Sequence, residues 1–504
     1  MRHFFANIRR FSLSARHSRR PVMDPLVVIY GCTGTGKSDL AVELAVRFNG
    51  EVINADAMQM YQGLPIITNK ITAKEQRGVP HYLLGNIPLE EEPWTVIEYK
   101  REATRIISEI RSRGKLPILV GGSSYYLDGL LFENQVVERQ PDTDGDVLTQ
   151  TEIAAKFPIL SDSADAMLKK LREVDPAMAD KWHPNDVRKI RNSLQIFLTT
   201  GRRASEIYAE NQSLKVSKWA HSDPAAPTPS PWNALLLWLY ANPESLNPRL
   251  DSRVDRMVEN GLIAETAEMY DYLEARLAYG KTIDRTKGIW QSIGFRQFEP
   301  YLCALKAGET AAADLSSLME AGIVDTKTAT RRYAKYQVRW VTMKTLTSLQ
   351  EEKALDRFYL LDSSDIKSWG EEVLAKGVEL TGQLLAGEPM PLPTTLSETA
   401  RAVLTSKVER SKHQVTPCRR VCDLCNKVVL TEELWQTHVQ SNRHRAAVRY
   451  AKRTALVVVD QPQLDVMAEE ASSQALKTDP QTLEADFQVL EESHNHIQKQ
   501  DNPL

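Results

Sequence analysis

A glycine-rich run, GCTGTGKS at residues 31–38, matches the G-x-x-x-x-G-K-[ST] pattern of a phosphate-binding P-loop. The glycines of such a loop allow tight turns, so that successive backbone N–H groups point at a phosphate. Lys37 adds a positive charge, and the Ser38 hydroxyl can ligate Mg²⁺. The residues expected to hold phosphate are Thr33, Gly34, Thr35, Gly36, Lys37 and Ser38.

The other parts of a nucleotide hydrolase are not evident. A nucleoside triphosphatase has an acid at the tip of a second strand to hold its metal ion, but LPILVGG at residues 116–122 ends in two glycines. A GTPase would carry an NKxD motif, and the nearest run, TNKIT at 68–72, has Thr72 in place of that Asp. The one acid that ends a predicted strand is Asp56, within INADAMQMY at 53–61. The sequence therefore predicts phosphate binding without the usual hydrolytic apparatus.

A second constellation, near the C-terminus, has the spacing of a metal site. CDLCNKVVLTEELWQTHVQSNRH follows C-x2-C-x12-H-x5-H, and its four candidate ligands are Cys422, Cys425, His438 and His444. Two thiolates and two imidazoles at this spacing suit tetrahedral Zn²⁺ in a small finger. Cys418 is spare, although it could replace Cys422 at a poorer spacing.

This finger would need a small core, which Val428 or Val429 with Leu434 and Trp435 could supply once metal is bound. The many basic residues around the motif favour an RNA contact, and a purely structural or protein-binding finger is the alternative. A single finger reads about three base pairs, which is too few for a transcription factor.

The elements that must position the P-loop alternate between strand and helix. LVVIY at 26–30 is a predicted buried strand that runs into the loop, and SDLAVELAVRF at 38–48 follows with apolar residues at helical spacing. EVINAD at 51–56 and LPILVGG are further predicted strands, and ALLLWLY at 234–240 returns the chain to the sheet. This order predicts an α/β fold, a P-loop parallel sheet with helices on both faces, an inserted helical lobe and a small C-terminal zinc finger.

Changes in composition divide the chain, with Pro-rich breaks at 221–232 and 387–395. The predicted divisions are a presequence-like segment at 1–22, the P-loop core at 23–139, a helical insertion at 140–220, a return to the core with a helical region at 232–385, a linker at 386–417, the zinc finger module at 418–453 and a disordered acidic tail at 454–504.

The composition is ordinary for a globular protein, with 42% hydrophobic and 26% charged residues. The net charge of -3 gives no global sign of nucleic-acid binding, and five cysteines in 504 residues do not indicate a disulfide framework. No apolar run reaches about 18 residues, so no membrane partner is expected.

The N-terminal 22 residues are rich in Arg and Ser and contain no acid, which is the composition of a mitochondrial presequence. A disordered basic tail is the alternative. Initiation at Met23 would yield an untargeted form, so we expect the protein in the mitochondrion and the cytoplasm. The finger could also direct part of it to the nucleus.

Seven motifs, in order from residue 31 to residue 340, resemble those of the tRNA dimethylallyltransferases, also called tRNA isopentenyltransferases. They are GCTGTGKS, INADAMQMY, TNKITAKEQRGVPHYLL, VGGSSYY at 120–126, RLDSRVDRMVENGLIAE at 249–265, QSIGFRQF at 291–298 and TRRYAKYQVRW at 330–340. The resemblance implies transfer of a dimethylallyl group from dimethylallyl diphosphate to the exocyclic amine of the adenosine next to the anticodon. The P-loop would then hold the diphosphate of the donor.

The residues suit this chemistry. An adenine amine is a poor nucleophile, and Asp56 is the candidate base that accepts its proton; a Mg²⁺-ordering or helix-capping role is the alternative. The resemblance implies that Arg253 closes over the diphosphate, while Arg249, one turn earlier, is the other candidate. It also implies that Ser123, where the family more often has Thr, contacts the substrate adenosine.

The resemblance extends to contacts with tRNA. The segment Asp56, Ala57, Met58 and Gln59 resembles the one that reads the flipped adenosine and its neighbours, although Gln59 could equally face solvent. NDVRKIRNSLQIF at 185–197 aligns with a family segment that contacts tRNA, which implicates Arg188, Lys189, Ile190, Arg191 and Asn192. Asn192, Gln195 and Tyr336 depart from the more usual Arg, Glu and Arg.

The expected partners are the tRNA anticodon stem-loop and dimethylallyl diphosphate. The expected cofactors are Mg²⁺ for catalysis and Zn²⁺ in the finger. The protein is expected to be a monomer. The nearest rival is an adenylate isopentenyltransferase acting on free nucleotides, which would need neither the helical insertion nor the basic finger. A rival from another class is an ATP-dependent kinase or NTPase with an RNA-binding finger. A noncatalytic RNA-binding protein is a third.

Overall fold

The computed structural model describes residues 24–132, 150–210, 213, 232–280, 283–308, 312–412, 417–425 and 427–455. The chain forms two compact units, the first comprising residues 1–149 and 202–414 and the second residues 150–201 and 415–504. The predicted presequence and nearly all of the predicted acidic tail lie outside the described residues. Within the described ranges, no helix is both long enough and apolar enough to cross a membrane.

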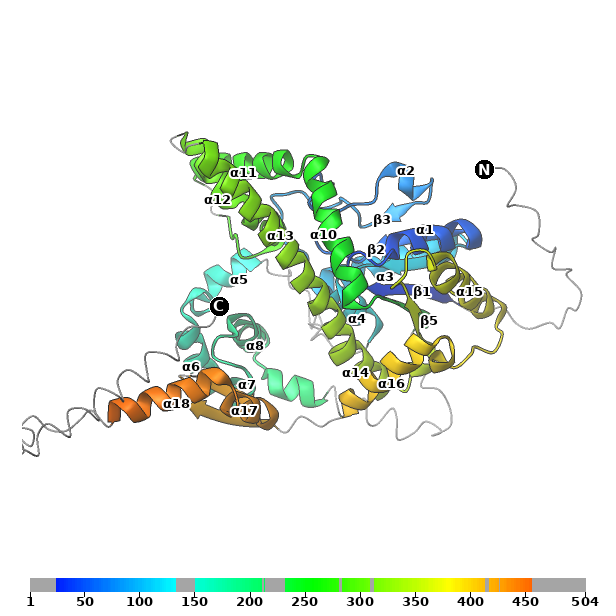
Figure 1. Cartoon of the computed structure of the whole chain (residues 1–504). Coiled ribbons are helices and arrows are strands. Elements are labelled where there is room, and N and C mark those ends of the chain that lie inside the picture. The colour runs from blue at the N-terminus through cyan, green and yellow to red at the C-terminus, as the bar shows by residue number, and fades with distance from the viewer. Residues whose placement is uncertain are drawn as a thin grey trace, which may run out of the picture. The chain divides into compact units, whose positions relative to one another are not determined.

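The first unit is built on a six-stranded parallel sheet (Figure 1). In spatial order its strands are β3 (His81–Tyr82), β2 (Gly50–Asn54), β4 (Leu116–Val120), β1 (Pro25–Gly31), β5 (Asn233–Tyr240) and β6 (Phe358–Asp362). Every neighbouring pair is parallel, which confirms the predicted fold class. The chain leaves β1 toward β2 on one side and places β5 on the other. The carboxyl ends of β1 and β4 therefore border the switch point where sheets of this kind bind ligands.

The α-helices of this unit are α1 (Lys37–Phe48), α2 (Ala73–Gln76), α3 (Val96–Ser112), α4 (Ser124–Leu131), α10 (Pro243–Glu259), α11 (Leu262–Ala278), α12 (Phe295–Ala307), α13 (Ala312–Trp340), α14 (Leu346–Glu351), α15 (Lys376–Ala386) and α16 (Glu398–Lys412). Short 3₁₀- or π-helical turns are η2 (Gly288–Gln291), η3 (Val341–Thr345), η4 (Leu355–Arg357), η5 (Gly370–Ala375) and η6 (Pro393–Thr395).

Helices cover both faces of the sheet because successive strand residues point to opposite sides. On one face, Val27 and Ile29 of β1 pack with buried side chains of α1 and α15. On the other, Val28 and Tyr30 pack with those of α3, α4 and α14. The strand residues of β1 are thus buried on both sides, as in other parallel sheets covered by helices.

Two strands were not expected from the sequence. β3 has only two residues, and β6 lies in the 232–385 division, where the sequence predicted a strand only at 234–240. Periodicity cannot distinguish a short apolar run such as FYLLD from part of a buried helix. In addition, β2 ends at Asn54 and β4 at Val120, two residues before their predicted ends, because Ala55 and Gly121 turn away from the sheet.

The turns that follow β2 and β4 are packed backbone to backbone. The Ala55 N–H donates to the Val120 carbonyl at 2.8 Å, and the Ser123 N–H donates to the Ala55 carbonyl at 3.1 Å. A Cβ added to Gly121 would lie 2.1 Å from the Ala55 carbonyl oxygen. Only glycine therefore fits here, and its lack of a side chain brings the two turns together.

The buried carboxylate of Asp128 links α4 to β1, α13 and η3. Asp128 of α4 accepts hydrogen bonds from the Tyr30 hydroxyl at 3.0 Å, the Trp340 indole at 2.8 Å and the Thr345 hydroxyl at 2.9 Å. Burial raises the pKa of Asp128 to about 7, against the opposing effect of these three donors. The contact fixes the end of α13 and the η3 turn against β1 and α4.

The second unit combines residues 150–201, which belong to the helical insertion predicted at 140–220, with the finger module. Its elements are α5 (Gln150–Lys156), η1 (Pro158–Ser161), α6 (Ala164–Val174), α7 (Pro176–Lys181), α8 (Val187–Thr200), β7 (Pro417–Cys422), β8 (Lys427–Thr431), α17 (Glu432–Val439) and α18 (Asn442–Ala455). The His183 imidazole meets the Val428 carbonyl at 3.1 Å, and Arg419 lies 3.6 Å from Asp180. Two segments far apart in sequence therefore form one body.

We expect Gly121→Ala to lower the free energy of unfolding by about 2–3 kcal/mol, because the added carbon would collide with the Ala55 backbone, which cannot easily yield. Gly370→Ala is the matched control, since its Cβ would meet no atom within 4 Å. Urea unfolding of the two purified variants measures the difference. Equal stability of the two would show that the turns are not packed this closely.

Candidate functional site

The P-loop joins the carboxyl end of β1 to the first turn of α1. Gly34 and Gly36 each have φ of 84°, a left-handed conformation that favours glycine. Added Cβ atoms would lie 2.8 Å from the Leu250 side chain at Gly34 and 2.7 Å from the Trp369 indole nitrogen at Gly36. Both backbone conformation and neighbouring side chains therefore require the glycines that the motif predicted.

Side-chain hydrogen bonds hold the loop in shape. The Thr35 hydroxyl donates to the Cys32 carbonyl at 2.9 Å, and the Ser363 hydroxyl donates to the Thr35 carbonyl at 3.0 Å. The Lys37 ammonium donates to the Cys32 carbonyl at 2.6 Å, and burial lowers the pKa of Lys37. Ser38, in the first turn of α1, is exposed.

Arg253 of α10 also contacts the P-loop. Arg253 donates to the Thr33 hydroxyl at 2.5 Å, and its Nε is buried without a hydrogen-bond partner among the described residues. Burial lowers the pKa of Arg253. Arg249 instead donates to the carbonyls of Ser363, at 2.6 Å, and Ser364. Of the two candidates, Arg253 therefore has the position to bind phosphate, and Arg249 holds the neighbouring turn.

Helix α13 fixes the position of α10, and the two run side by side in Figure 1. Lys327 pairs with Asp255 at 2.6 Å, and Arg331 pairs with Asp251. These two acids flank Arg253 in the sequence of α10. The pairs hold one face of α10 against α13, and Arg253, which lies between the two acids in sequence, contacts the P-loop at Thr33.

Asp56 lies just beyond β2, where burial raises the pKa of its carboxyl against the opposing charges of Lys37 and Arg253. Its Oδ1 accepts the Met58 N–H at 3.1 Å. One carboxylate oxygen thus caps its own turn, although no helix begins there. The other oxygen leaves the carboxylate able to accept a proton, and a raised pKa makes it a better base.

Ser123 lies beside Asp56 and is held by two neighbours. Its hydroxyl accepts the Ala57 N–H at 3.0 Å. The Tyr333 hydroxyl of α13 is hydrogen-bonded to both Ser123 and Gln337, and burial together with the Asp56 charge raises the pKa of Tyr333, so the phenol is neutral. A polar chain therefore runs from α13 to the turn that carries Asp56.

Gln337, one helical turn after Tyr333, connects the two halves of the site. Its Oε1 accepts the Thr33 N–H at 3.0 Å, and its Nε2 donates to the Gly122 carbonyl at 3.0 Å. The side chain is 4% exposed. One buried amide therefore joins the P-loop to the turn after β4.

The loop that carries Gln59 is held through its own backbone. The Gln59 amide nitrogen donates to the carbonyls of Thr68 at 3.2 Å and Asn69 at 3.0 Å. This side chain is engaged within the loop and does not simply face solvent. Ala57 and Met58 are partly buried against the core.

A buried acid holds the far end of the same loop. Glu265 of α11 accepts the Ile66 N–H at 3.1 Å and the Ile67 N–H at 2.6 Å. Burial lowers the pKa of Lys70 to about 8, although the charges of Glu265 and Asp56 oppose the shift. The lysine charge therefore lies within electrostatic reach of the proposed base.

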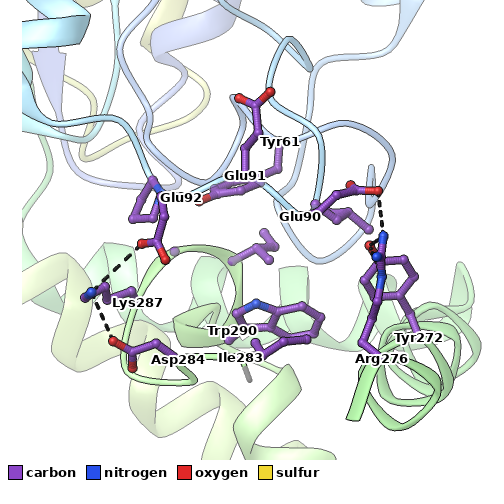
Figure 2. Close-up of a pocket in the computed structure, with 14 residues that line it drawn as sticks. Tyr61, Glu90, Glu91, Glu92, Tyr272, Arg276, Ile283, Asp284, Lys287 and Trp290 are labelled. Atoms are coloured by element: carbon purple, nitrogen blue, oxygen red, sulfur yellow. Dashed lines mark hydrogen bonds and ion pairs between the residues drawn. The ribbon is translucent and has the colours of Figure 1, made fainter. Parts of the chain in front are cut away.

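A separate pocket of about 150 Å³ is lined in part by Tyr61 (Figure 2). Its lining includes the carboxylates of residues 90–92, and Trp290 lies between the charged side chains in Figure 2. Arg276 pairs with Glu90 at 2.9 Å, and Lys287 pairs with Asp284 at 3.1 Å. Neither the P-loop nor Asp56 lines it. Its four carboxylates outnumber its two cations, Arg276 and Lys287, and this excess of negative charge disfavours the binding of a diphosphate there.

Helix α8 of the second unit carries the residues expected to contact tRNA. Arg188, Lys189 and Asn192 are exposed, and Arg191 is partly exposed. Ile190 is fully buried. The expectation that Ile190 contacts tRNA is therefore wrong for its side chain, which packs inside the lobe, as the helical period of α8 requires.

The four predicted metal ligands come together in the second unit. The ligand atoms of Cys422, Cys425, His438 and His444 all lie within 4.8 Å of one another. Cys422 ends β7, Cys425 lies in the turn before β8, and the histidines come from α17 and α18. The His438 Nε2 atom is buried without a hydrogen-bond partner in the described structure, as expected of a nitrogen that binds a metal. The group can therefore hold a metal ion.

The core of the finger differs in part from the expectation. Val429 is 3% exposed, as predicted, and Trp435 is partly buried beneath the Arg420 guanidinium, 5.4 Å from its ring centre. Leu434 is 56% exposed, so its predicted core role is wrong. Leu434 follows the two acids of the first turn of α17, on the outward face of that helix.

Three residues of the site were not singled out from the sequence: Tyr333, Gln337 and Glu265. Tyr333 and Gln337 are four residues apart, a spacing that places them on one face of α13 and could have drawn attention to them. Glu265 occupies an apolar face of α11 and is 7% exposed. A buried acid needs hydrogen-bond donors, and here two backbone N–H groups provide them.

Comparison with known proteins gives consistent matches. Residues 59–344 match the model of the family described as IPP transferase. The tRNA dimethylallyltransferase of Schizosaccharomyces pombe is 36% identical over 86% of this chain and 97% of its own length, and that of Homo sapiens is 34% identical over 85% and 87%. A crystal structure of a eukaryotic dimethylallyltransferase acting on tRNA superposes with a TM-score of 0.68 and 32% identity over 86% of this chain and 98% of that one.

We expect Arg253→Ala to weaken the binding of inorganic pyrophosphate roughly tenfold or more, since a hydrogen bond to a charged group contributes about 1.5–3 kcal/mol. Arg401→Ala is the control, because it removes an exposed arginine of α16 that pairs with Glu398. Isothermal titration of each protein with pyrophosphate and Mg²⁺ measures the affinity. Unchanged affinity in Arg253→Ala would remove Arg253 from the phosphate site.

Proposed function

Because the chain belongs to the IPP transferase family, we propose that it is a tRNA prenyltransferase that transfers a dimethylallyl group from dimethylallyl diphosphate to tRNA. The acceptor is the exocyclic amine of the adenosine next to the anticodon. The observation that carries this proposal is the convergence of a P-loop, Arg253 and the buried carboxylate of Asp56 at one edge of the sheet. A phosphate site beside a base fits transfer from a diphosphate donor to an amine.

The donor side of the site is cationic. Lys37 and Arg253 lie where charge develops on the departing diphosphate, and the loop N–H groups add donors. The exposed Ser38 hydroxyl could hold a Mg²⁺ ion beside the diphosphate. When bound there, such an ion would neutralise part of the diphosphate charge.

The acceptor side is formed by Asp56 and Ser123. The adenine amine nitrogen forms a bond to the first carbon of the dimethylallyl group as the bond from that carbon to the diphosphate oxygen breaks. The diphosphate leaves with the electron pair of that bond, and the amine proton passes to Asp56. Ser123, held by Ala57 and Tyr333, orients the adenosine.

The second unit provides a basic surface for the tRNA. Arg188, Lys189 and Asn192 are exposed on α8, and phosphate contacts from such residues fix register and orientation on a nucleic acid. The metal of the finger is proposed to be Zn²⁺, since two thiolates and two imidazoles within 4.8 Å of one another suit a closed tetrahedral site.

Mass spectrometry of nucleosides tests the proposed function directly. Unmodified tRNA is incubated with the purified protein, Mg²⁺ and dimethylallyl diphosphate, and isopentenyladenosine is sought beside the anticodon. Prenylation of AMP or ADP without modification of tRNA would favour an adenylate isopentenyltransferase. Absence of both, with ATP hydrolysis, would favour an NTPase.

We expect Asp56→Asn to reduce transfer by about 10² to 10⁴-fold, while leaving stability nearly unchanged. Asn keeps an oxygen for the Met58 N–H but cannot accept the amine proton, so this variant separates the base from the capping role. If Asp56 only caps its turn, Asn should retain the wild-type rate.

The pH dependence of the wild-type rate is a second test of whether Asp56 acts as the base. Because burial raises the pKa of Asp56 above its ordinary 3.8, the active carboxylate is lost as pH falls through that raised value. Kcat/KM should therefore decline on the acid side with a midpoint above 3.8. The residual rate of Asp56→Asn should lack this limb.

Cys422→Ser is expected to abolish stoichiometric zinc, because it removes one of the four ligands, whereas Cys418→Ser should retain it. Elemental analysis of protein purified without chelators measures the metal content of both variants. The reverse pattern would make Cys418 the fourth ligand. Zinc retained by both variants would place the ion elsewhere.

A further inference from the structure

An exposed aromatic group lies beside Ser123. It consists of Tyr125 of α4 and Tyr336 and Trp340 of α13. The centres of the Tyr125 and Trp340 rings are 5.8 Å apart at 78°, and those of the Tyr336 and Trp340 rings are 6.1 Å apart at 58°. Tyr125 is 41% exposed and Tyr336 is 55% exposed. Each tyrosine therefore contacts the indole and still presents much of its surface to solvent.

This aromatic group is rigidly attached to the reaction site. The Trp340 indole N–H is bound by the buried Asp128 carboxylate at 2.8 Å, which fixes the plane of its ring. Tyr125 follows Ser123 by two residues. Tyr336 directly precedes Gln337, which binds the P-loop at Thr33. On both helices, the group is therefore within two residues of a side chain of the site where the adenosine and the diphosphate are proposed to meet.

Positive charge accompanies the aromatic rings along α13. Arg332, Tyr336 and Arg339 are spaced four and three residues apart, so they share one face of the helix, and Lys335 is adjacent. All four side chains are exposed. Among the residues that the structure describes, none of these three cations has a carboxylate within ion-pair distance. Their charge is thus available to an anionic partner.

We propose that this aromatic group is a stacking site for an unpaired base of the tRNA loop, one that directly flanks the modified adenosine. The inference rests on the proposed function and names a contact of that same site. Withdrawing an adenosine from the loop leaves its neighbours without one stacking partner. An aromatic side chain can replace that partner, and cations beside it can bind the adjoining phosphates.

A base-specific comparison of binding tests this contact. Affinities are measured by fluorescence anisotropy for an anticodon stem-loop RNA and for two copies that carry an abasic residue on the 5′ or the 3′ side of the target adenosine. The proteins are wild type, Tyr336→Ala and Tyr336→Phe. Tyr279→Ala is the matched control, since Tyr279 is an 85% exposed tyrosine at the end of α11.

Tyr336→Ala is expected to weaken binding of the intact RNA about 5- to 50-fold, the range for loss of one base–aromatic stack. Tyr336→Phe and Tyr279→Ala should stay within about twofold, because the ring at 336 is retained in both. Wild type should lose a similar factor on one of the abasic RNAs. On that RNA, Tyr336→Ala should cause little further loss.

Two results would overturn the inference. One is an unchanged affinity of Tyr336→Ala for the intact RNA. The other is an equal loss on intact and abasic RNAs, which would mean that the ring does not contact a flanking base. A raised KM for dimethylallyl diphosphate with unchanged RNA affinity would assign the ring to the prenyl chain instead.

The test does not depend on catalysis. Binding is measured without turnover, so failure of the wild type to prenylate the same intact RNA would count against the proposed function alone. Trp340 is not substituted, because its loss would also release the buried Asp128 carboxylate.

Discussion

The site depends on one buried amide, the side chain of Gln337. This amide forms hydrogen bonds both to the P-loop and to the turn after β4. Its oxygen holds the Thr33 N–H of the P-loop, and its nitrogen holds the Gly122 carbonyl beside Ser123. An amide carries both an acceptor and a donor at a fixed separation. The distance between the P-loop and the turn after β4 is therefore set by a single rigid group.

Glycine makes this close arrangement possible. A Cβ at Gly122 would lie 2.3 Å from the Gln337 amide nitrogen and 3.3 Å from an Asp56 carboxylate oxygen. At Gly121 it would collide with the Ala55 carbonyl. Gly121 and Gly122 are the two residues that stand where a nucleotide hydrolase would have an acid. Because they lack side chains, α13 and Asp56 can lie close to the end of β4.

Opposite charges lie together in the same small volume. Burial alone would favour neutral forms of Lys37, Arg253 and Asp56, and each opposite charge works against that effect. Two cations face one carboxylate, so the buried set keeps an excess of positive charge. A diphosphate would complete the balance, which explains why this site suits a polyanionic donor.

The sequence was sufficient where function depends on residues close together along the chain. The P-loop and the four metal ligands follow local spacing rules, and their geometry matches. The role of Gln337 could not be assigned this way, because its partner Thr33 is 304 residues away and only packing brings α13 to the P-loop. Ile190 and Leu434 show the reverse error, since a motif alone does not say which face of its helix is buried.

The second unit shows how a small metal module gains a partner from elsewhere in the chain. Within the described structure the finger has little apolar core, but the Val428 carbonyl of β8 accepts the N–H of His183. The other His183 nitrogen accepts the Asn185 N–H at 3.1 Å, so this imidazole is held as a single tautomer. Arg419 adds an ion pair to Asp180 at 3.6 Å. The loop before α8 is thus bound by the finger immediately ahead of the helix that carries Arg188 and Lys189.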